Sequence, residues 1–205
     1  MPRIDCYLTM SSPWAYLGHG VLGEIAARHG VTVSYYPLAF GRLFPETGGL
    51  PLPQRHPARQ RYRLVELQRW REARGLPLRL APAKWPFAPE LADRCVVAIA
   101  ETGGDPAVFM ARAFAAIWNE ERDLADRATL KEIATAVGFD GAALLDRAEA
   151  AGSAAVYDTN LQRALAAGVF GAPSYVRDGE VFWGQDRLAL LDAALGSGRA
   201  PYLPG

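Results

Sequence analysis

The most constraining feature of the sequence is its opening strand–helix–strand pattern. Residues 3–8 form a short β-prone run, residues 12–30 have the character of a helix, and residues 31–38 form a second β-prone run. Pro13 suits the first turn of a helix, and Gly30 suits its end. Two strands joined by a helix pair in parallel through a right-handed crossover. We therefore expect an α/β fold that starts with this unit.

A long helical block separates this unit from a second pair of strands. From about residue 60 to 168 the helical pattern dominates, with apolar residues at intervals of three and four. After the block, Asp178-Gly179 lies between two β-prone runs and predicts a hairpin, and residues 185–196 predict a final helix. Within the block, the sequence predicts helix N-caps at Asp105, Asp126, Asp140 and Ser153.

The stretch from 41 to 58 is the most irregular part of the chain. Prolines and glycines recur through it, and both residues interrupt regular secondary structure. Long irregular connections in compact domains are usually functional or disordered. We therefore expect a long functional loop or lid here.

The order of these elements is that of a thioredoxin-like fold with an all-helical domain inserted after its second strand. The predicted domains are residues 1–58 together with 169–205, and the insertion 59–168. In "VFGAPSYV", Pro173 stands at the start of the third strand, where a proline is tolerated because it need not donate to the ladder. The thioredoxin fold holds a cis proline at this place, so we expect a cis bond before Pro173.

Composition and charge limit where the protein can be located and which partners it can bind. The chain has 22 basic and 22 acidic residues, so no net field attracts nucleic acid or an anionic membrane. No apolar run has the length of a signal peptide or a membrane span. We expect a cytoplasmic protein in which Cys6 and Cys95 are buried free thiols.

The stretch "TMSSPWAYLG" stands at the first strand-to-helix junction. With cysteines in place of Ser12 and Ala15 it would be a Cys-Pro-Trp-Cys redox loop, so no dithiol chemistry is expected. Unpaired amides and the helix dipole at this position favour an anion such as a thiolate, and the Ser12 hydroxyl can donate to its sulfur. The alternative is that Ser12 is only an N-cap, and the two roles are compatible.

The chain resembles the 2-hydroxychromene-2-carboxylate isomerases and the kappa-class glutathione transferases of the DsbA-like thioredoxin superfamily. The resemblance lies in four stretches in the same order, "DCYLTMSSPWAYLG", "YRLVELQRW", "VFGAPSYV" and "FWGQDRLALL". It implies a fold of the DsbA and kappa type, glutathione as cofactor, and Ser12 as the residue that assists the glutathione thiol. Ser11 is one residue farther from the helix start and is the weaker candidate. We also expect a homodimer.

The resemblance further implies where glutathione binds. Gln185 and Asp186 match the polar pair that holds its γ-glutamyl end, and Arg59 matches a lysine that contacts its glycine carboxylate. The backbone of Ala172, just before Pro173, would pair with the tripeptide as an added strand does. The alternative for Asp186 is that it only caps a helix or complements its dipole.

The arginine cluster from position 55 to 63 has a second interpretation. Four arginines in nine positions usually form a solvated helix face, and we expect this for Arg61 and Arg63. The sequence also departs from the family in "ETGGLPLP", where the family commonly carries an asparagine. In the following "AKWPFAPELADR", Lys84 could bind an anionic substrate and Trp85 an aromatic one, with core packing as the alternative for Trp85.

The resemblance implies a glutathione-dependent isomerase that opens a hydroxychromene carboxylate by reversible thiolate addition, in the degradation of aromatic compounds. The alternatives are a kappa-like transferase or peroxidase that consumes glutathione, and a non-catalytic thioredoxin-like binding module. No metal is expected, because His19, His29 and His56 lack companions at ligand spacing. The substrate expected is a small aromatic carboxylate, with no nucleic-acid or membrane partner.

Overall fold

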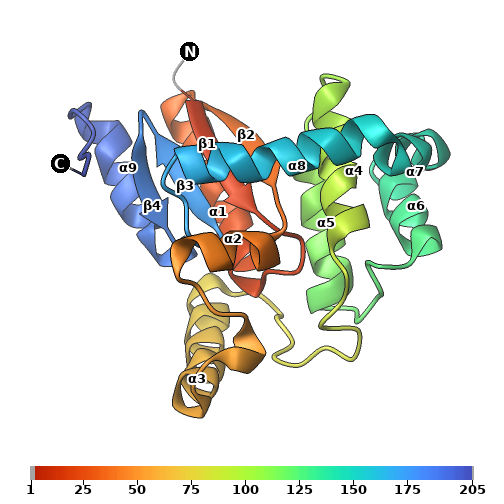
Figure 1. Cartoon of the computed structure of the whole chain (residues 1–205), viewed down its shortest axis with the longest axis horizontal. Helices are drawn as coiled ribbons and strands as arrows, with labels where there is room; N and C mark the ends of the chain where they lie inside the picture. The colour runs from red at the N-terminus through yellow and green to blue at the C-terminus, as the bar shows by residue number, and fades with distance from the viewer. Residues whose placement is uncertain (1–2, 205) are drawn as a thin grey trace.

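A four-stranded sheet lies at the centre of the fold, with its strands in the order β2-β1-β3-β4 (Figure 1). The computed structural model describes residues 3–204. β1 (Arg3–Leu8) pairs in parallel with β2 (Thr32–Pro37) and antiparallel with β3 (Ser174–Arg177). β3 pairs antiparallel with β4 (Glu180–Trp183). The parallel pair confirms the strand–helix–strand prediction.

The helices of the middle of the chain lie between β2 and β3. In Figure 1, α4 to α7 form a group on the right, α8 runs from this group across to the sheet, and α3 extends downward from the rest. The helical elements are α1 (Pro13–His29), α2 (Phe40–Thr47), η1 (Leu52–Gln54), α3 (Pro57–Arg74), α4 (Glu90–Glu101), α5 (Ala107–Trp118), α6 (Arg127–Ala136), α7 (Gly141–Glu149), α8 (Ala151–Ala166), η2 (Gln185–Arg187) and α9 (Leu188–Ser197).

Alternation along β1 divides the core between the two faces of the sheet. Ile4, Cys6 and Leu8 are buried in one cluster with side chains of α1, α5 and α9. Tyr7 is buried in a second cluster with side chains of α2 and α8. Successive residues of a strand point to opposite faces, so helices cover both faces of the sheet. This is the thioredoxin-like arrangement that the order of elements predicts.

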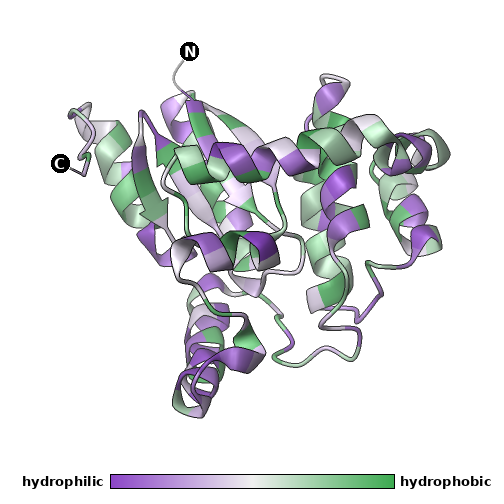
Figure 2. Cartoon of the chain, in the orientation of Figure 1, coloured by the Kyte–Doolittle hydropathy of each residue, from purple (hydrophilic) through white to green (hydrophobic). Residues whose placement is uncertain are grey.

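The helices differ in how much apolar surface they bury. Phe109, Phe114 and Trp118 of α5 are almost completely buried, whereas Leu67 is the buried residue of α3. Figure 2 shows the same contrast, with α3 mainly hydrophilic and the helical group on the right richer in apolar residues. Within residues 3–204, no helix is both long and apolar enough to span a membrane.

Two of the four predicted N-caps are confirmed. Asp126 and Asp140 accept hydrogen bonds from amides in the first turns of α6 and α7. The N-cap of α5 is Pro106, so the prediction at Asp105 is wrong by one residue, although Asp105 Oδ1 accepts a 2.9 Å hydrogen bond from the Ala107 N–H. The prediction at Ser153 is wrong. α8 begins two residues earlier, and Ser153 Oγ donates a 3.0 Å hydrogen bond to Glu101 of α4 instead. The serine joins two helices rather than starting one.

The prediction of a long loop from 41 to 58 is wrong for its first part. Residues 40–47 form α2, even though Pro45 lies inside it. Phe40 and Leu43 lie on the face of α2 that packs against the sheet and α8, and both are buried. Burial of this apolar face outweighs the poor helix propensity of glycine and proline, as tertiary packing commonly does.

The second strand pair is as predicted. Asp178 and Gly179 join β3 to β4 with φ of 50° and 86°, the geometry of a two-residue type I′ turn. The bond between Ala172 and Pro173 is cis, as expected. A second cis bond, before Pro86, was not predicted. Cys6 and Cys95 are both buried and free, which confirms the prediction for the thiols.

Candidate active site

The loop of residues 9–12 leads from β1 into α1 and ends in the helix cap. Ser12 has an extended backbone, and its Oγ accepts a 3.2 Å hydrogen bond from the N–H of Ala15. The residue is 8% exposed. The N-cap interpretation is therefore confirmed. A hydroxyl that accepts a hydrogen bond still has its own O–H to donate, so the cap does not use up the donor of Ser12.

The first turn of α1 offers a second donor beside that hydroxyl. Pro13 has no N–H, the Ala15 N–H bonds to Ser12 Oγ, and the Tyr16 N–H bonds to the Ser12 carbonyl oxygen at 3.2 Å. The Trp14 N–H has no protein acceptor in the part of the chain that the structure describes. An unpaired amide and the dipole at a helix N-terminus both stabilise an anion.

A buried carboxylate holds the inner side of this loop. Asp93 of α4 is 0% exposed, and its Oδ1 accepts a 2.7 Å hydrogen bond from the N–H of Met10. Its Oδ2 accepts hydrogen bonds of 3.0 Å from the Thr9 hydroxyl and from the Tyr157 hydroxyl of α8. Burial raises the pKa of Asp93 to about 7, although the three hydrogen bonds act in the opposite direction. The helices α4 and α8 thus fix the backbone that leads to Ser12.

Sequence reasoning missed Asp93, although a signal was present. In the helical stretch "ELADRCVVAIAE", Asp93 shares a face with Val96 and Val97, which are buried. A carboxylate on an apolar helix face must find hydrogen-bond partners, because an unpaired buried charge is costly. The pattern indicates a buried polar contact, but it does not identify the loop that supplies the partners.

A pocket of about 220 Å³ opens beside the start of α1. It brings together Ala172, Gln185 and Asp186, three of the residues predicted to bind glutathione, and Trp14 from the first turn of α1. The other lining residues are Glu66, Trp70, Trp183, Gly184 and Arg187. The first turn of α1 and three of the predicted glutathione residues therefore border one pocket. The pocket lining does not include the other predicted site residues, Ser12, Arg59, Lys84, Trp85 and Pro173.

Gln185 and Asp186 differ in how far they are already engaged. They lie in the 3-10 turn before α9 rather than in the helix itself. Gln185 is 2% exposed, and its Oε1 accepts bonds of 3.1 and 2.9 Å from Arg74, so only its amide N–H groups remain for a ligand. Asp186 is exposed and pairs with Arg187 at 2.8 Å. Surface pairs of this kind contribute little, so Asp186 can exchange this partner for a ligand.

A close approach of α1 to the sheet sets the position of Gln185. A Cβ on Gly18 would stand 2.5 Å from the Tyr175 hydroxyl oxygen and 2.9 Å from the Gln185 Cβ. Real Cβ atoms essentially never come so near another heavy atom. The helix therefore packs against β3 and the Gln185 turn only because this position has no side chain.

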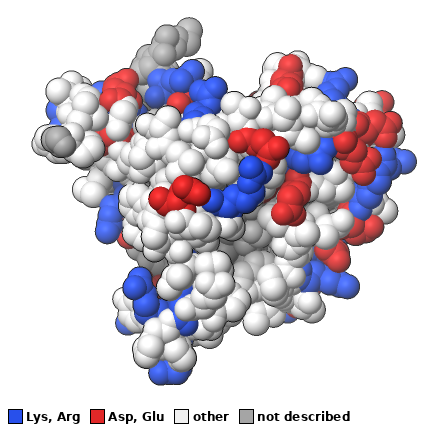
Figure 3. Space-filling view, viewed as in Figure 1, with Lys and Arg blue, Asp and Glu red and all other residues white. Residues whose placement is uncertain are grey.

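The arginine cluster divides between solvent and the interior. Arg59 and Arg61 are exposed, and so is Lys84. Figure 3 shows Lys and Arg side chains predominating over α3, in the lower part of the view. The prediction that Arg63 lies on a solvated face is wrong. Its guanidinium carbon stands 5.1 Å from the ring centroid of Trp85, and burial is the main cause that lowers the pKa of Arg63 to about 10.

Trp85 joins the core and the site. Its ring lies 6.0 Å from that of Trp118, which is almost completely buried, so the core-packing alternative is confirmed in part. Its Nε1 also donates a 3.0 Å hydrogen bond to the carbonyl oxygen of Ser11. The linker between α3 and α4 is therefore tied to the loop that carries Ser12.

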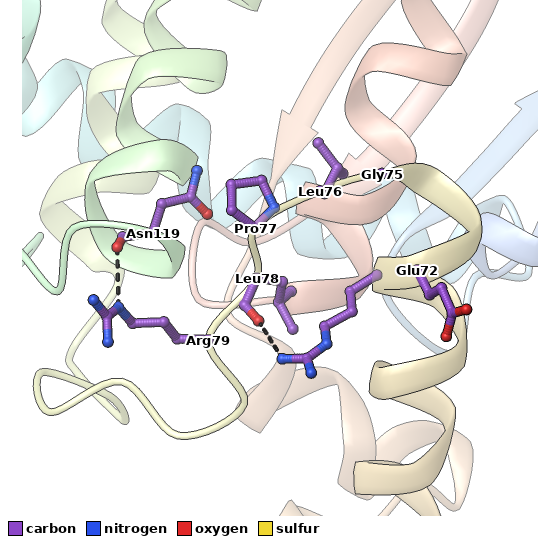
Figure 4. A pocket seen from close by; sticks show the side chains of 8 residues that line it. Glu72, Gly75, Leu76, Pro77, Leu78, Arg79 and Asn119 are labelled. Atoms are coloured by element: carbon purple, nitrogen blue, oxygen red, sulfur yellow. Dashed lines mark hydrogen bonds between the residues drawn. The ribbon is translucent and has the colours of Figure 1, made fainter.

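A larger hollow, of about 790 Å³, lies elsewhere (Figure 4). It is formed mainly by the end of α3 and the linker that follows it. Its arginines are engaged, because Arg71 donates to the carbonyl oxygen of Leu78 and Arg79 to that of Asn119. None of the predicted site residues lines it. Size alone therefore does not identify the active site.

Fold and site together define the class of protein. Residues 3–196 match the family model described as a DSBA-like thioredoxin domain, and the chain belongs to this family. A 2-hydroxychromene-2-carboxylate isomerase from Sphingobium xenophagum is 29% identical, over 94% of this chain and 97% of the relative. A solved structure of 2-hydroxychromene-2-carboxylate isomerase matches with a TM-score of 0.81 and 26% identity, over 95% of both chains.

A second kind of relative is similar over a shorter range. Glutathione S-transferase kappa 1 from Caenorhabditis elegans is 32% identical over 40% of this chain and 36% of the relative. The resemblance inferred from four short stretches is thus confirmed, and the relatives similar over nearly the full length are named isomerases.

Proposed function

We propose that this chain is an isomerase that uses glutathione to convert a 2-hydroxychromene-2-carboxylate, or a related aromatic unsaturated carboxylate. The observation that carries the proposal is the start of α1. There neither the Ser12 O–H nor the Trp14 N–H has a hydrogen-bond acceptor within residues 3–204. The isomerases that match in sequence and structure support the reaction class.

The thiols of the chain itself are unsuited to the reaction. A cysteine reacts as its thiolate, and burial disfavours that charge. Burial raises the pKa of Cys95 to about 12 and raises the pKa of Cys6 still further. Ser12 and Ala15 stand where a redox loop would carry its sulfurs. A thiol at the start of α1 must therefore come from outside the chain.

Groups of the pocket, of the start of α1 and of α3 together fit glutathione. Asp186 presents a carboxylate for the ammonium of the γ-glutamyl end, and Arg59 presents a guanidinium for the glycine carboxylate. Ala172 presents backbone groups for strand-like pairing. Ser12 and Trp14 donate hydrogen bonds that hold the sulfur as a thiolate. When bound, glutathione would supply a thiolate for reversible addition to the conjugated substrate.

A second candidate is a transferase that consumes glutathione. The relative named Glutathione S-transferase kappa 1 favours it, because this chain is 32% identical to that relative over 83 residues. The two functions differ in the fate of the sulfur. The isomerase releases the thiol it used, whereas the transferase leaves it in the product.

The test follows the absorbance of a 2-hydroxychromene-2-carboxylate with glutathione, with S-methylglutathione and without thiol. Of the three conditions, we expect turnover only in the presence of glutathione. The glutathione concentration should be unchanged after many turnovers. S-methylglutathione is the matched control, because it has the same ends but no free thiol. Loss of one glutathione per product would identify the transferase. Turnover without any thiol would contradict both candidates.

A further inference from the structure

Arg63 is a partly buried cation without an anionic partner. The ion pair of α3 joins Arg69 and Glu66, and no described carboxylate lies within ion-pair distance of Arg63. Its neighbours are cationic, since Arg55 also lowers the pKa of Arg63. α3 itself carries six arginines and two glutamates. The local field therefore favours an anion that the protein does not supply.

The position of Arg63 connects it to the active-site loop. Its guanidinium carbon lies 5.1 Å from the Trp85 ring centroid, and Trp85 Nε1 is bonded to the carbonyl oxygen of Ser11. One indole ring thus separates the cation from the residue next to Ser12. Lys84 is adjacent in sequence to Trp85, but it is exposed, whereas Arg63 is half-buried.

The energetics of this arrangement favour a ligand. A buried cation without a partner costs free energy, and contact with one aromatic face offsets only part of it. A carboxylate ligand would offset the rest, because the planar guanidinium matches it with two parallel hydrogen bonds. The Trp85 ring beside it adds an apolar surface suited to an aromatic ligand.

We propose that Arg63 binds the carboxylate of the aromatic substrate, held in place by the ring of Trp85. This inference rests on the proposed function. Arg59 lies one helical turn away on α3 and is exposed, so it remains for the glycine carboxylate of glutathione. Two cations one turn apart thus serve two different carboxylates, and the inner one selects the substrate.

The experiment measures binding of 2-hydroxycinnamate and of its neutral amide by calorimetry, with and without glutathione. Arg63→Gln should weaken binding of 2-hydroxycinnamate about tenfold to 100-fold, as expected for a hydrogen bond to a charged group. The affinity for the neutral amide should not change. Arg61→Gln is the matched control, because Arg61 is an exposed arginine of the same helix, and it should change carboxylate affinity less than about threefold. Arg63→Lys should fall between the parent and Arg63→Gln, because it keeps the charge and loses the fork.

The variants should fold, because Arg63 has no ion pair to lose, and circular dichroism checks this. Equal carboxylate affinity in Arg63→Gln and the parent would overturn the inference. So would weakened glutathione binding with unchanged hydroxycinnamate binding, since Arg63 would then serve the tripeptide. If the parent binds hydroxycinnamate through Arg63 but turns over no chromene carboxylate, the inference stands and the proposed isomerase activity fails.

Discussion

The two sides of the loop at residues 9–12 differ in how their polar groups are paired. On the inner side, Asp93 accepts three hydrogen bonds, and its partners include the hydroxyls of Thr9 and Tyr157. On the outer side, Arg63 has no anionic partner among residues 3–204, and Asp186 has only a surface pair. The polar groups of the inner side are buried and paired, whereas those of the outer side are more exposed and incompletely paired.

This difference separates structural from binding roles. A satisfied buried network fixes one backbone arrangement, because each group that moved would lose its partner without gaining water. Charges that lack a strong partner cost stability, and proteins commonly bear such costs at functional sites. Changes on the inner side should therefore lower the free energy of unfolding, and changes on the outer side should lower affinity.

The largest effect is expected from Asp93→Ala. It leaves the Met10 N–H and the hydroxyls of Thr9 and Tyr157 without their acceptor, so the free energy of unfolding should fall by about 3–5 kcal/mol. Urea unfolding measures it. Asp93→Asn is the matched control, because its amide oxygen can still accept from Met10 and the loss should be smaller. Equal losses in the two variants would mean that the hydrogen bonds do not hold the loop.

Ser12 lies between the inner and the outer side of the loop, and the substitution Ser12→Ala tests its role. It should slow isomerisation about 10–1,000-fold, the range for deleting one donor to a developing anion. The pKa of bound glutathione should rise, because less of the thiolate is stabilised, and part of the loss should be recovered at higher pH. Thiolate absorbance against pH measures the shift. Ser11→Ala serves as control, and a larger defect there would refute the role of Ser12.

Asp186→Ala tests the outer side by itself. Glutathione affinity should fall by about 1.5–3 kcal/mol, as for a hydrogen bond to a charged group, while the free energy of unfolding stays nearly constant. Calorimetry and urea unfolding measure the two quantities. Asp146→Ala is the matched control, since Asp146 is an exposed aspartate that pairs with Arg127 on the distant helical group. An unchanged dissociation constant for Asp186→Ala would remove this residue from the site.

The smallest effect concerns the proton on Asp93. Its pKa in the folded protein is about 7, above the ordinary value of 3.8, so between these values the folded state holds a proton that the unfolded state has released. Stability from this group is therefore highest at low pH and is lost as the pH rises through 7. The parent should lose about 1 kcal/mol from pH 6 to pH 8 relative to Asp93→Asn, which cannot titrate there. Parallel unfolding profiles for the two proteins would contradict the raised pKa.

Local signals predicted most of the fold. Pro13 and Gly30 bracket α1, and the Asp178-Gly179 turn joins β3 to β4, because these residues act through their own backbone preferences. The prediction failed where distant packing decides. Nothing within residues 40–47 reveals that an apolar face there is covered by the sheet and α8. Domain boundaries depend on packing in the same way, and those given above stay a prediction.

The same limit applies to the candidate site. The N-cap at Ser12 could be predicted because its place before a helix is a local property, but the partners of Asp93 lie 64 to 84 residues away in sequence. Arg63 was misjudged because helical spacing does not show that a linker tryptophan 22 positions later covers it. The role of Ser12 toward a thiol and the homodimer stay predictions. So do the glutathione contacts and the substrate contacts expected of the other site residues, which are Arg59, Ala172, Pro173, Gln185 and Asp186 for glutathione and Lys84 and Trp85 for the substrate.

The close packing around Gly18 restricts which residues this position can tolerate. Alanine is normally the better helix residue, yet here its methyl group would press on Tyr175 and Gln185 and push the helix start away from the pocket. The spacing between the N-terminal half of α1 and the Gln185 turn thus depends on the absence of a side chain at this position. In a saturation library this position should accept glycine and reject every other residue.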